Sequence, residues 1–394
     1  MNGAKGIKTR EILFSFIILV IFFLILELIA RIVDPVSKDE KLYPLTSDDL
    51  LHHKWTPELI SIDSDRSVPY TLYINKQSWV EQYDVQIKKP ENTYRIFYIG
   101  DSNTQGVVAP EKKMVEIVEK RLNEIYAPRG NRIEVINTGT SSYSIILYYL
   151  LIKNRILQYS PDMVVINIDM TDVPNDYTYK KSAVFDSNGD PVAIPQSRDT
   201  FNKYYVLTPH GGVEIPRLVR LKLALSERFR IVHLLDYLYD KYIIQRQPSA
   251  AGKMKISKIL AAQEGEQQPA DWLSLDWTDS IKENVDYSMH LLELTIKLLQ
   301  ANHIKAVVTG VPHYPQYTGE WSARPHDVLE ETCRKNNCLF LNSYQALKPD
   351  ITNTEKTKYY WATDPTHFNE SGNVLWAKVQ LDFLLNNKNK LLDF

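Results

Sequence analysis

The stretch IFYIGDSNTQG, from Ile96 to Gly106, joins an apolar run to a polar turn. The run has the composition of a buried strand, and Asp-Ser-Asn follows its closing glycine at once. Open α/β sheets bind their ligands at the carboxyl ends of the strands. Ser102 therefore stands where a nucleophile would be expected, although an ordinary polar turn residue is the alternative.

Apolar strands alternate with helical patterns along most of the chain. The run Asp162–Asp169 is apolar on both faces, which is typical of a parallel sheet covered by helices. Strands are predicted at Tyr94–Gly100, Arg132–Gly139, Asp162–Asp169, Ile304–Pro312 and Cys338–Tyr344, and helices at Lys112–Tyr126, Ser144–Tyr159, Ile281–Asn302, Pro325–Lys335 and Glu370–Leu385. This alternation predicts an α/β fold built on a doubly wound parallel five-stranded sheet.

A membrane anchor is predicted near the N-terminus. Ile12–Val33 is apolar apart from three residues, and its length matches the hydrocarbon core of a bilayer. A cleaved signal peptide is the alternative, but the sequence after the span offers no good small-residue cleavage site. Lys5, Lys8 and Arg10 precede the span, so the positive-inside rule places them in the cytoplasm and the rest of the chain outside it.

The chain is accordingly divided into four parts: a cytoplasmic tail (1–11), a transmembrane anchor (12–33), a juxtamembrane segment (34–92) and a main domain (93–394). An insertion is predicted at about 177–280, where the alternation of strands and helices pauses. It holds a probable long helix whose apolar stripe suits packing against the domain, with a lid or a membrane-surface helix as alternatives. The stripe consists of Leu218, Leu221, Leu225, Phe229, Val232 and Leu235.

Composition and charge exclude some classes of function. The 394 residues carry a net charge of −2, which gives no support for nucleic-acid binding. Cys333 and Cys338 are too few for a cysteine metal site, and they are either two thiols or a disulfide in an oxidising compartment. No metal or cofactor is predicted.

A base for Ser102 is available near the other end of the chain. In TDPTHFNESGN, His367 can take the serine proton, and Asp364 three residues earlier can hold the other imidazole nitrogen. The strand carrying Ser102 comes first in the sheet, and the loop carrying His367 precedes the last helix. The spacing therefore predicts a Ser102–His367–Asp364 triad delivered by two loops at one edge of the sheet.

YIGDSNTQG together with TDPTHFNESGNVLWA resembles the GDSL, or SGNH, hydrolases, which are flavodoxin-like esterases and deacylases. The resemblance covers about Tyr94–Tyr177 and Ile281–Leu385. It implies a flavodoxin-like order of strands and a serine nucleophile at Ser102. It further implies that the backbone N–H of Gly139, in INTGTSSYS, joins that of Ser102 in an oxyanion hole.

The chain departs from this family after the third strand, where the family usually has Gly-x-Asn-Asp. The equivalent stretch reads DMTD, so Thr171 falls where the oxyanion-hole asparagine is expected. A threonine hydroxyl is a shorter donor with another direction, and Asn175 could replace it only if the loop shifts. Losing one such donor costs about 10²–10³ in rate in other enzymes. The activity is therefore expected to be slow, tuned to an unusual substrate, or absent.

Several aromatic or polar residues are candidates for substrate binding. Tyr143 follows the Gly139 loop, Trp361 comes shortly before Asp364, and His313 lies beyond the fourth strand. They could contact a sugar or another substrate, and packing of their loops onto the domain is the alternative.

These features predict a membrane-anchored serine esterase or deacylase of the bacterial cytoplasmic (inner) membrane, with its domain facing the periplasm or exterior. Its expected substrate is an acyl ester, for example an acetyl group, on an extracytoplasmic glycan or lipid-linked glycan. Two alternatives stay open: an O-acyltransferase using the same site, and a non-catalytic protein that binds or assembles an envelope polysaccharide.

Overall fold

The computed structural model describes residues 4–33, 45–63, 70–195 and 271–392, together with 206–207, 213–214, 225, 229, 231–232 and 235. The chain divides into two compact units, Met1–Glu40 with Asn202–Gln267 and Lys41–Phe201 with Gln268–Phe394. The sheet and the candidate site belong to the second unit.

Within the first unit, α1 (Ala4–Val33) is the described element of greatest length. Its stretch Arg10–Arg31 is long and apolar enough to cross a membrane, with a mean hydropathy of 3.2 over its most apolar 18 residues. The side chains of this stretch are largely exposed.

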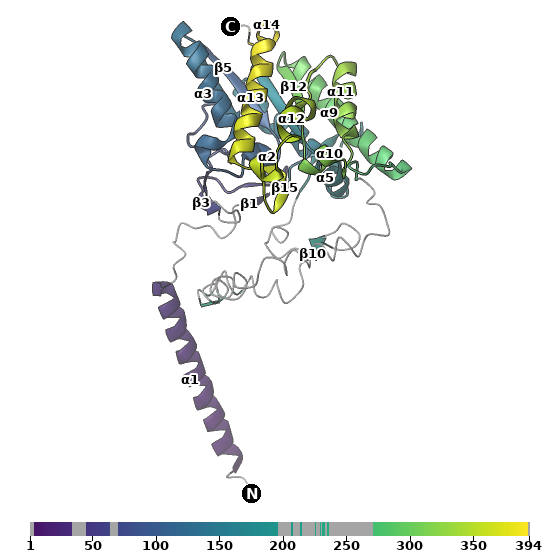
Figure 1. The fold of residues 1–394 in the computed structure, drawn as a ribbon. Coiled ribbons are helices and arrows are strands. Elements are labelled where there is room, and N and C mark those ends of the chain that lie inside the picture. Colours follow the sequence, from purple (N-terminus) through teal and green to yellow (C-terminus); the bar gives the residue numbers. More distant parts are fainter. Residues whose placement is uncertain are drawn as a thin grey trace. The chain divides into compact units, whose positions relative to one another are not determined.

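A five-stranded parallel sheet forms the centre of the second unit (Figure 1). Its strands lie in the order β6-β5-β7-β12-β13. When they are numbered along the chain, this is the flavodoxin-like order 2-1-3-4-5. The bounds are β5 (Thr93–Ile99), β6 (Arg132–Asn137), β7 (Met163–Asp169), β12 (Lys305–Val311) and β13 (Leu339–Leu341). The predicted doubly wound α/β fold is confirmed.

Alternate residues of the strands face two separate cores. On β5, Phe97 and Ile99 pack with α4 (Ile145–Leu151) and α9 (Asp279–Ala301). Ile96 and Tyr98 face the opposite core, with α3 (Met114–Tyr126) and α13 (Glu370–Asn386), which contact each other over that face (Figure 1). Because helices cover both faces, apolar residues of the strands point to both sides of the sheet, as the sequence of β7 indicated.

The elements differ from the sequence prediction mainly at their ends. The predicted helix Ser144–Tyr159 is α4 followed by a π-helical turn (Ile152–Ile156) and a 3₁₀ turn (Leu157–Tyr159). The last predicted strand is too long, because Asn342 caps a new helix α12 (Ser343–Ile351) by accepting a hydrogen bond from the Gln345 N–H. Other helices and turns in the described part of the chain include α5 (Asp172–Tyr179), α10 (Tyr314–Thr318), α11 (Arg324–Lys335), α14 (Lys388–Leu391) and the 3₁₀ turns Pro110–Lys112, Ala127–Arg129 and Lys356–Lys358.

The predicted juxtamembrane segment supplies two small hairpins to the second unit. They are β1 (Leu45–Asp48) with β2 (His52–Trp55), and β3 (Ile60–Asp63) with β4 (Tyr70–Tyr73). Trp55 and Tyr70 pack in a third core cluster with Val107, Val108 and Trp361. This segment therefore packs against residues that flank the candidate site.

Much of the predicted insertion lies outside the described residues, including Leu218, Leu221 and the polar stretch before Asp271. Its described part has two short antiparallel pairs, β8 (Val184–Phe185) with β9 (Pro191–Ala193) and β10 (Val206–Leu207) with β11 (Val213–Glu214). Cys333 and Cys338 are free thiols in this structure, so the disulfide alternative is not realised here.

Candidate active site

Ser102 opens a single helical turn, α2 (Ser102–Gln105), directly after β5. Asp101 caps this turn by accepting a hydrogen bond from the Asn103 N–H over 2.8 Å. The preceding residue has to be glycine, because a Cβ on Gly100 would lie 2.0 Å from Thr104 Oγ1. The sequence GDS thus produces a tight strand-to-helix turn that leaves the Ser102 side chain half-buried.

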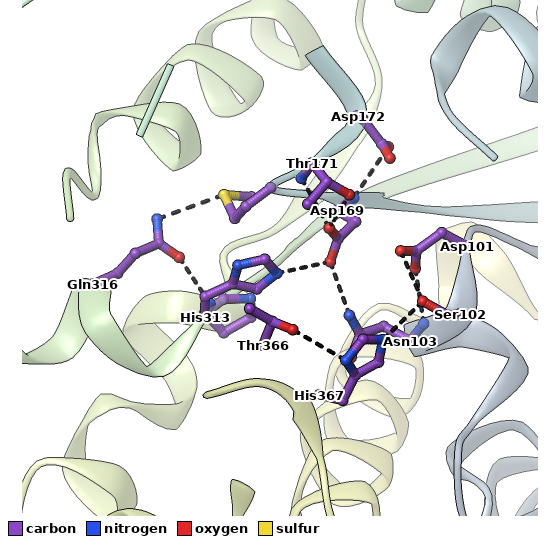
Figure 2. Close-up of polar contacts among 12 residues, drawn as sticks. Asp101, Ser102, Asn103, Asp169, Thr171, Asp172, His313, Gln316, Thr366 and His367 are labelled. Carbon is purple, nitrogen blue, oxygen red and sulfur yellow. Dashed lines mark hydrogen bonds and ion pairs between the residues drawn. The ribbon is translucent and has the colours of Figure 1, made fainter. Parts of the chain in front are cut away.

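Figure 2 shows the His367 ring beside Ser102, with a dashed line joining the two side chains. The two are joined by a contact of 2.8 Å between Ser102 Oγ and His367 Nε2. His367 lies on β15 (Asp364–Phe368), which pairs with β14 (Tyr360–Trp361) in a hairpin ahead of α13. The sequence predicted a loop here, and the hairpin delivers the same two side chains.

Asp364 completes the hydrogen-bonded chain, because its Oδ2 lies 2.8 Å from His367 Nδ1. Its other oxygen accepts from the Thr366 N–H (2.9 Å) and Thr366 Oγ1 (2.7 Å). Burial opposes ionisation, but the hydrogen bonds and the attraction from His367 and Thr366 outweigh it and lower the pKa of Asp364. An ionised Asp364 fixes the imidazole proton on Nδ1, which leaves Nε2 as the acceptor for the Ser102 hydroxyl.

The other predicted oxyanion-hole groups are turned toward internal partners. The Gly139 N–H donates to Asn137 Oδ1 over 3.0 Å. The Thr171 N–H and hydroxyl donate to Asp169 Oδ1 over 2.8 and 2.7 Å. The structure thus brings Ser102, His367 and Asp364 together. The donor groups of Gly139 and Thr171 are hydrogen-bonded to Asn137 and Asp169 instead.

Gly139 is required by packing whatever its N–H does. A Cβ at this position would lie 2.1 Å from the backbone nitrogen of Gln105, at the end of α2. Its carbonyl accepts from the Trp55 indole N–H over 2.9 Å, and His53 Nε2 lies 2.8 Å from the Ser141 carbonyl oxygen. The first N-terminal hairpin, through β2, therefore holds the loop that follows β6.

The predicted substrate-binding candidates lie mostly in the interior. Tyr143 is 1% exposed and donates its hydroxyl to the His53 carbonyl, and Trp361 is 8% exposed among the third core cluster. Their rings are not available to stack on a sugar in this structure. Asn175 lies half-buried in α5, where its N–H donates to the Thr171 carbonyl.

His313 is also buried, and its Nε2 lies 3.0 Å from Asp169 Oδ2. Asp169 has a pKa lowered to about 2, because the attraction of His313 and the hydrogen bonds from His313 and Thr171 outweigh the effect of burial. Burial, with repulsion from Asp169, raises the pKa of Asp101 well above its ordinary value, and Asp172 is raised similarly. The negative charge of this carboxylate cluster is thus concentrated on Asp169.

Sequence reasoning did not single out Asp169 or Asn103. The signal was present, because both are polar residues at the carboxyl ends of strands that the predicted sheet makes neighbours. Among the described residues, no group of three or more His, Cys, Asp or Glu side chains could hold a metal ion.

Comparisons with known proteins give structural likeness only. No family model matches the chain. No curated protein matches it either. An α/β hydrolase from the metagenome of Lake Arreo, Spain, is 11% identical with a TM-score of 0.41, over 73% of this chain and 94% of that one.

Two esterases give similar values. A two-domain esterase active on acetylated mannans is 13% identical with a TM-score of 0.40, over 76% of this chain and 50% of that one. A catalytic mutant of an acetylxylan esterase from Geobacillus stearothermophilus is 14% identical with a TM-score of 0.40, over 73% of this chain and 93% of that one.

Proposed function

We propose that this chain is a membrane-anchored serine esterase or deacylase of the SGNH type. The observation that carries the proposal is the continuous chain from Ser102 Oγ through His367 to Asp364, with both links at 2.8 Å. It lies at the carboxyl edge of the sheet, and its three side chains remain partly accessible.

In the first step Ser102 Oγ attacks the acyl carbonyl carbon while His367 Nε2 takes the hydroxyl proton. Asp364 stabilises the imidazolium that forms, because its Oδ2 already holds the Nδ1 proton. The tetrahedral intermediate collapses as His367 protonates the leaving alcohol, which leaves an acyl group on Ser102. Water then attacks this ester with His367 as base, and the carboxylic acid and free Ser102 are released.

The Ser102 N–H is the proposed first donor to the oxyanion. Gly139 and Thr171 could add donors only if their hydrogen bonds to Asn137 and Asp169 were exchanged during the reaction.

The anchor and the family resemblance together favour an acyl ester on a glycan outside the cytoplasm. With Lys5, Lys8 and Arg10 on the cytoplasmic side, α1 would place the domain in the periplasm or exterior of a bacterial inner membrane. Resistance of the full chain to carbonate extraction, and its digestion by protease added to spheroplasts, would support this placement. Release by carbonate, or protection from the protease, would contradict it.

Hydrolysis of p-nitrophenyl acetate by the full chain in detergent tests the chemistry. Ser102→Ala and His367→Ala should each reduce turnover to the background rate, and a fluorophosphonate should label Ser102 of the parent protein. Absence of turnover and of labelling in the parent would refute the proposal. Adding an acetylated glycan and an alcohol acceptor then separates hydrolysis from acyl transfer, because transfer yields a new ester.

A further inference from the structure

A second Asp–His pair lies behind the candidate nucleophile, on different elements from the first. Asp169 closes β7 and His313 follows β12, and their side chains are 2% and 1% exposed. The pair does not touch Ser102 itself. Figure 2 shows it on the far side of Asn103 from the Ser102–His367 contact.

Asp169 joins three parts of the site through four hydrogen bonds. It accepts from the Asn103 amide over 2.9 Å, from the Thr171 N–H and hydroxyl, and from His313 Nε2 over 3.0 Å. Asn103 is the residue next to Ser102 in α2 and is itself buried. The carboxylate thus fastens the nucleophile turn to the ends of β7 and β12.

His313 is in turn held by its surroundings. Its backbone N–H donates to Gln316 Oε1 over 2.9 Å, and its ring centroid lies 5.9 Å from that of Trp321. Being 1% exposed, it has no route to a substrate and can act only through Asp169.

Stability alone does not explain this arrangement. Desolvation of a buried Asp–His pair can cost more than the attraction returns. His313 Nδ1 is also buried without a hydrogen-bond partner among the residues that the structure describes. An apolar pair of similar size would fill the same volume without these costs, so the pair is better explained by the geometry that it imposes.

We infer that Asp169 and His313 are positioning residues that hold Asn103, and with it the α2 turn, so that Ser102 Oγ stays in line with His367 Nε2. This inference rests on the proposed function of Ser102 as the nucleophile. The pair takes no part in bond making. It sets the orientation of the turn that carries the reacting oxygen.

The test compares His313→Leu, which removes the donor to Asp169, with His313→Gln, whose amide can still donate. His326→Leu is the matched control, because His326 is equally buried and meets Gln316 instead of Asp169. Asn103→Ala removes the link between Asp169 and α2 but keeps both residues of the buried pair, and it replaces His313→Leu in the test if that variant fails to fold.

Two measurements on the full chain in detergent are needed. The first is hydrogen–deuterium exchange of the peptide spanning 99–106, which does not depend on activity. The second is the rate of Ser102 labelling by a fluorophosphonate, together with kcat and KM for p-nitrophenyl acetate.

His313→Leu and Asn103→Ala should speed exchange in α2 and slow labelling by about 10²-fold, with kcat reduced and KM nearly unchanged, since small misplacements of a nucleophile have effects of this size. His313→Gln should recover most of the rate, and His326→Leu should retain it.

Equal losses in His313→Leu and His326→Leu, or unchanged exchange in α2, would overturn the inference. If the parent protein is neither labelled nor active, the proposed function fails, whereas the exchange comparison still decides whether the pair holds the turn.

Discussion

Replacing Asp364 by asparagine should reverse the proton arrangement on His367. Asp364 Oδ1 accepts two hydrogen bonds from Thr366, one of them from its backbone N–H. An amide nitrogen cannot accept a hydrogen bond, so the oxygen of an asparagine must take this position. Its NH₂ group then faces His367 Nδ1, which at present lies 2.8 Å from Oδ2.

The consequence for Ser102 follows from the two ring nitrogens. An amide donor at Nδ1 requires that nitrogen to be unprotonated, so the imidazole proton moves to Nε2. Nε2 then loses the lone pair that accepts the Ser102 hydroxyl proton. A wrong tautomer in a triad of this kind lowers kcat by about 10⁴-fold, which is about 5.5 kcal/mol of transition-state stabilisation.

The assay is turnover of p-nitrophenyl acetate by Asp364→Asn, with the Ser102→Ala rate subtracted as background. Thr366→Val is the matched control, because it removes the hydroxyl that donates to Asp364 and lies 3.0 Å from His367 Nδ1 but keeps the backbone N–H and the carboxylate. It should cost about tenfold or less, because the carboxylate that fixes the tautomer of His367 is kept. An Asp364→Asn protein that keeps more than a tenth of the parent kcat would refute the tautomer argument.

Three further changes test the surroundings of the site. Burial raises the pKa of Glu119 from 4.5 to about 7, so the folded state binds the proton more tightly and stability should fall as the pH rises across this interval. Glu119→Gln, which can still accept from the Val135 N–H, should flatten this dependence and melt above the parent at pH 8; an unchanged Tm there would contradict it. Gly139→Ala should destabilise by about 1–3 kcal/mol in denaturant unfolding, because the added Cβ meets the Gln105 backbone, and a neutral result would show that α2 can yield. Trp55→Phe leaves the Gly139 carbonyl without its indole donor and should cost about 1–3 kcal/mol in the same assay, unless another donor replaces it.

The central sheet was predictable because its signals are local. Runs such as Met163–Asp169 are apolar on both faces, and α3 shows apolar residues at helical spacing. The order of the strands was expected from a family resemblance, and the observed pairing agrees with it. The packing of the N-terminal hairpins was harder to predict from the sequence, because contacts such as that of Trp55 with Gly139 join residues 84 positions apart.

The site could be predicted only as far as residue types and topology allow. Ser102 was proposed because it follows the first strand, and Asp364 and His367 because their spacing lets one loop before the last helix deliver both; the structure places them in one hydrogen-bonded chain. Their catalytic roles stay predictions. The partners of Gly139 and Thr171 depend on side-chain directions that spacing does not encode, since each donates to an oxygen just two positions earlier in the chain.

The groups proposed for proton transfer and the groups proposed for oxyanion binding differ in how they are hydrogen-bonded. The contacts that the proposed proton transfer needs are already present, because His367 lies 2.8 Å from both Ser102 Oγ and Asp364 Oδ2. The proposed oxyanion donors Gly139 and Thr171 instead each donate to an internal acceptor, and any donation to substrate would first have to break those hydrogen bonds. Each donor of this kind contributes about 10²–10³ to the rate of acyl transfer. Esters whose carbonyl is already activated by a good leaving group depend least on such donors. The resting arrangement should therefore favour activated esters strongly over alkyl esters, unless binding of the natural substrate turns Thr171 away from Asp169.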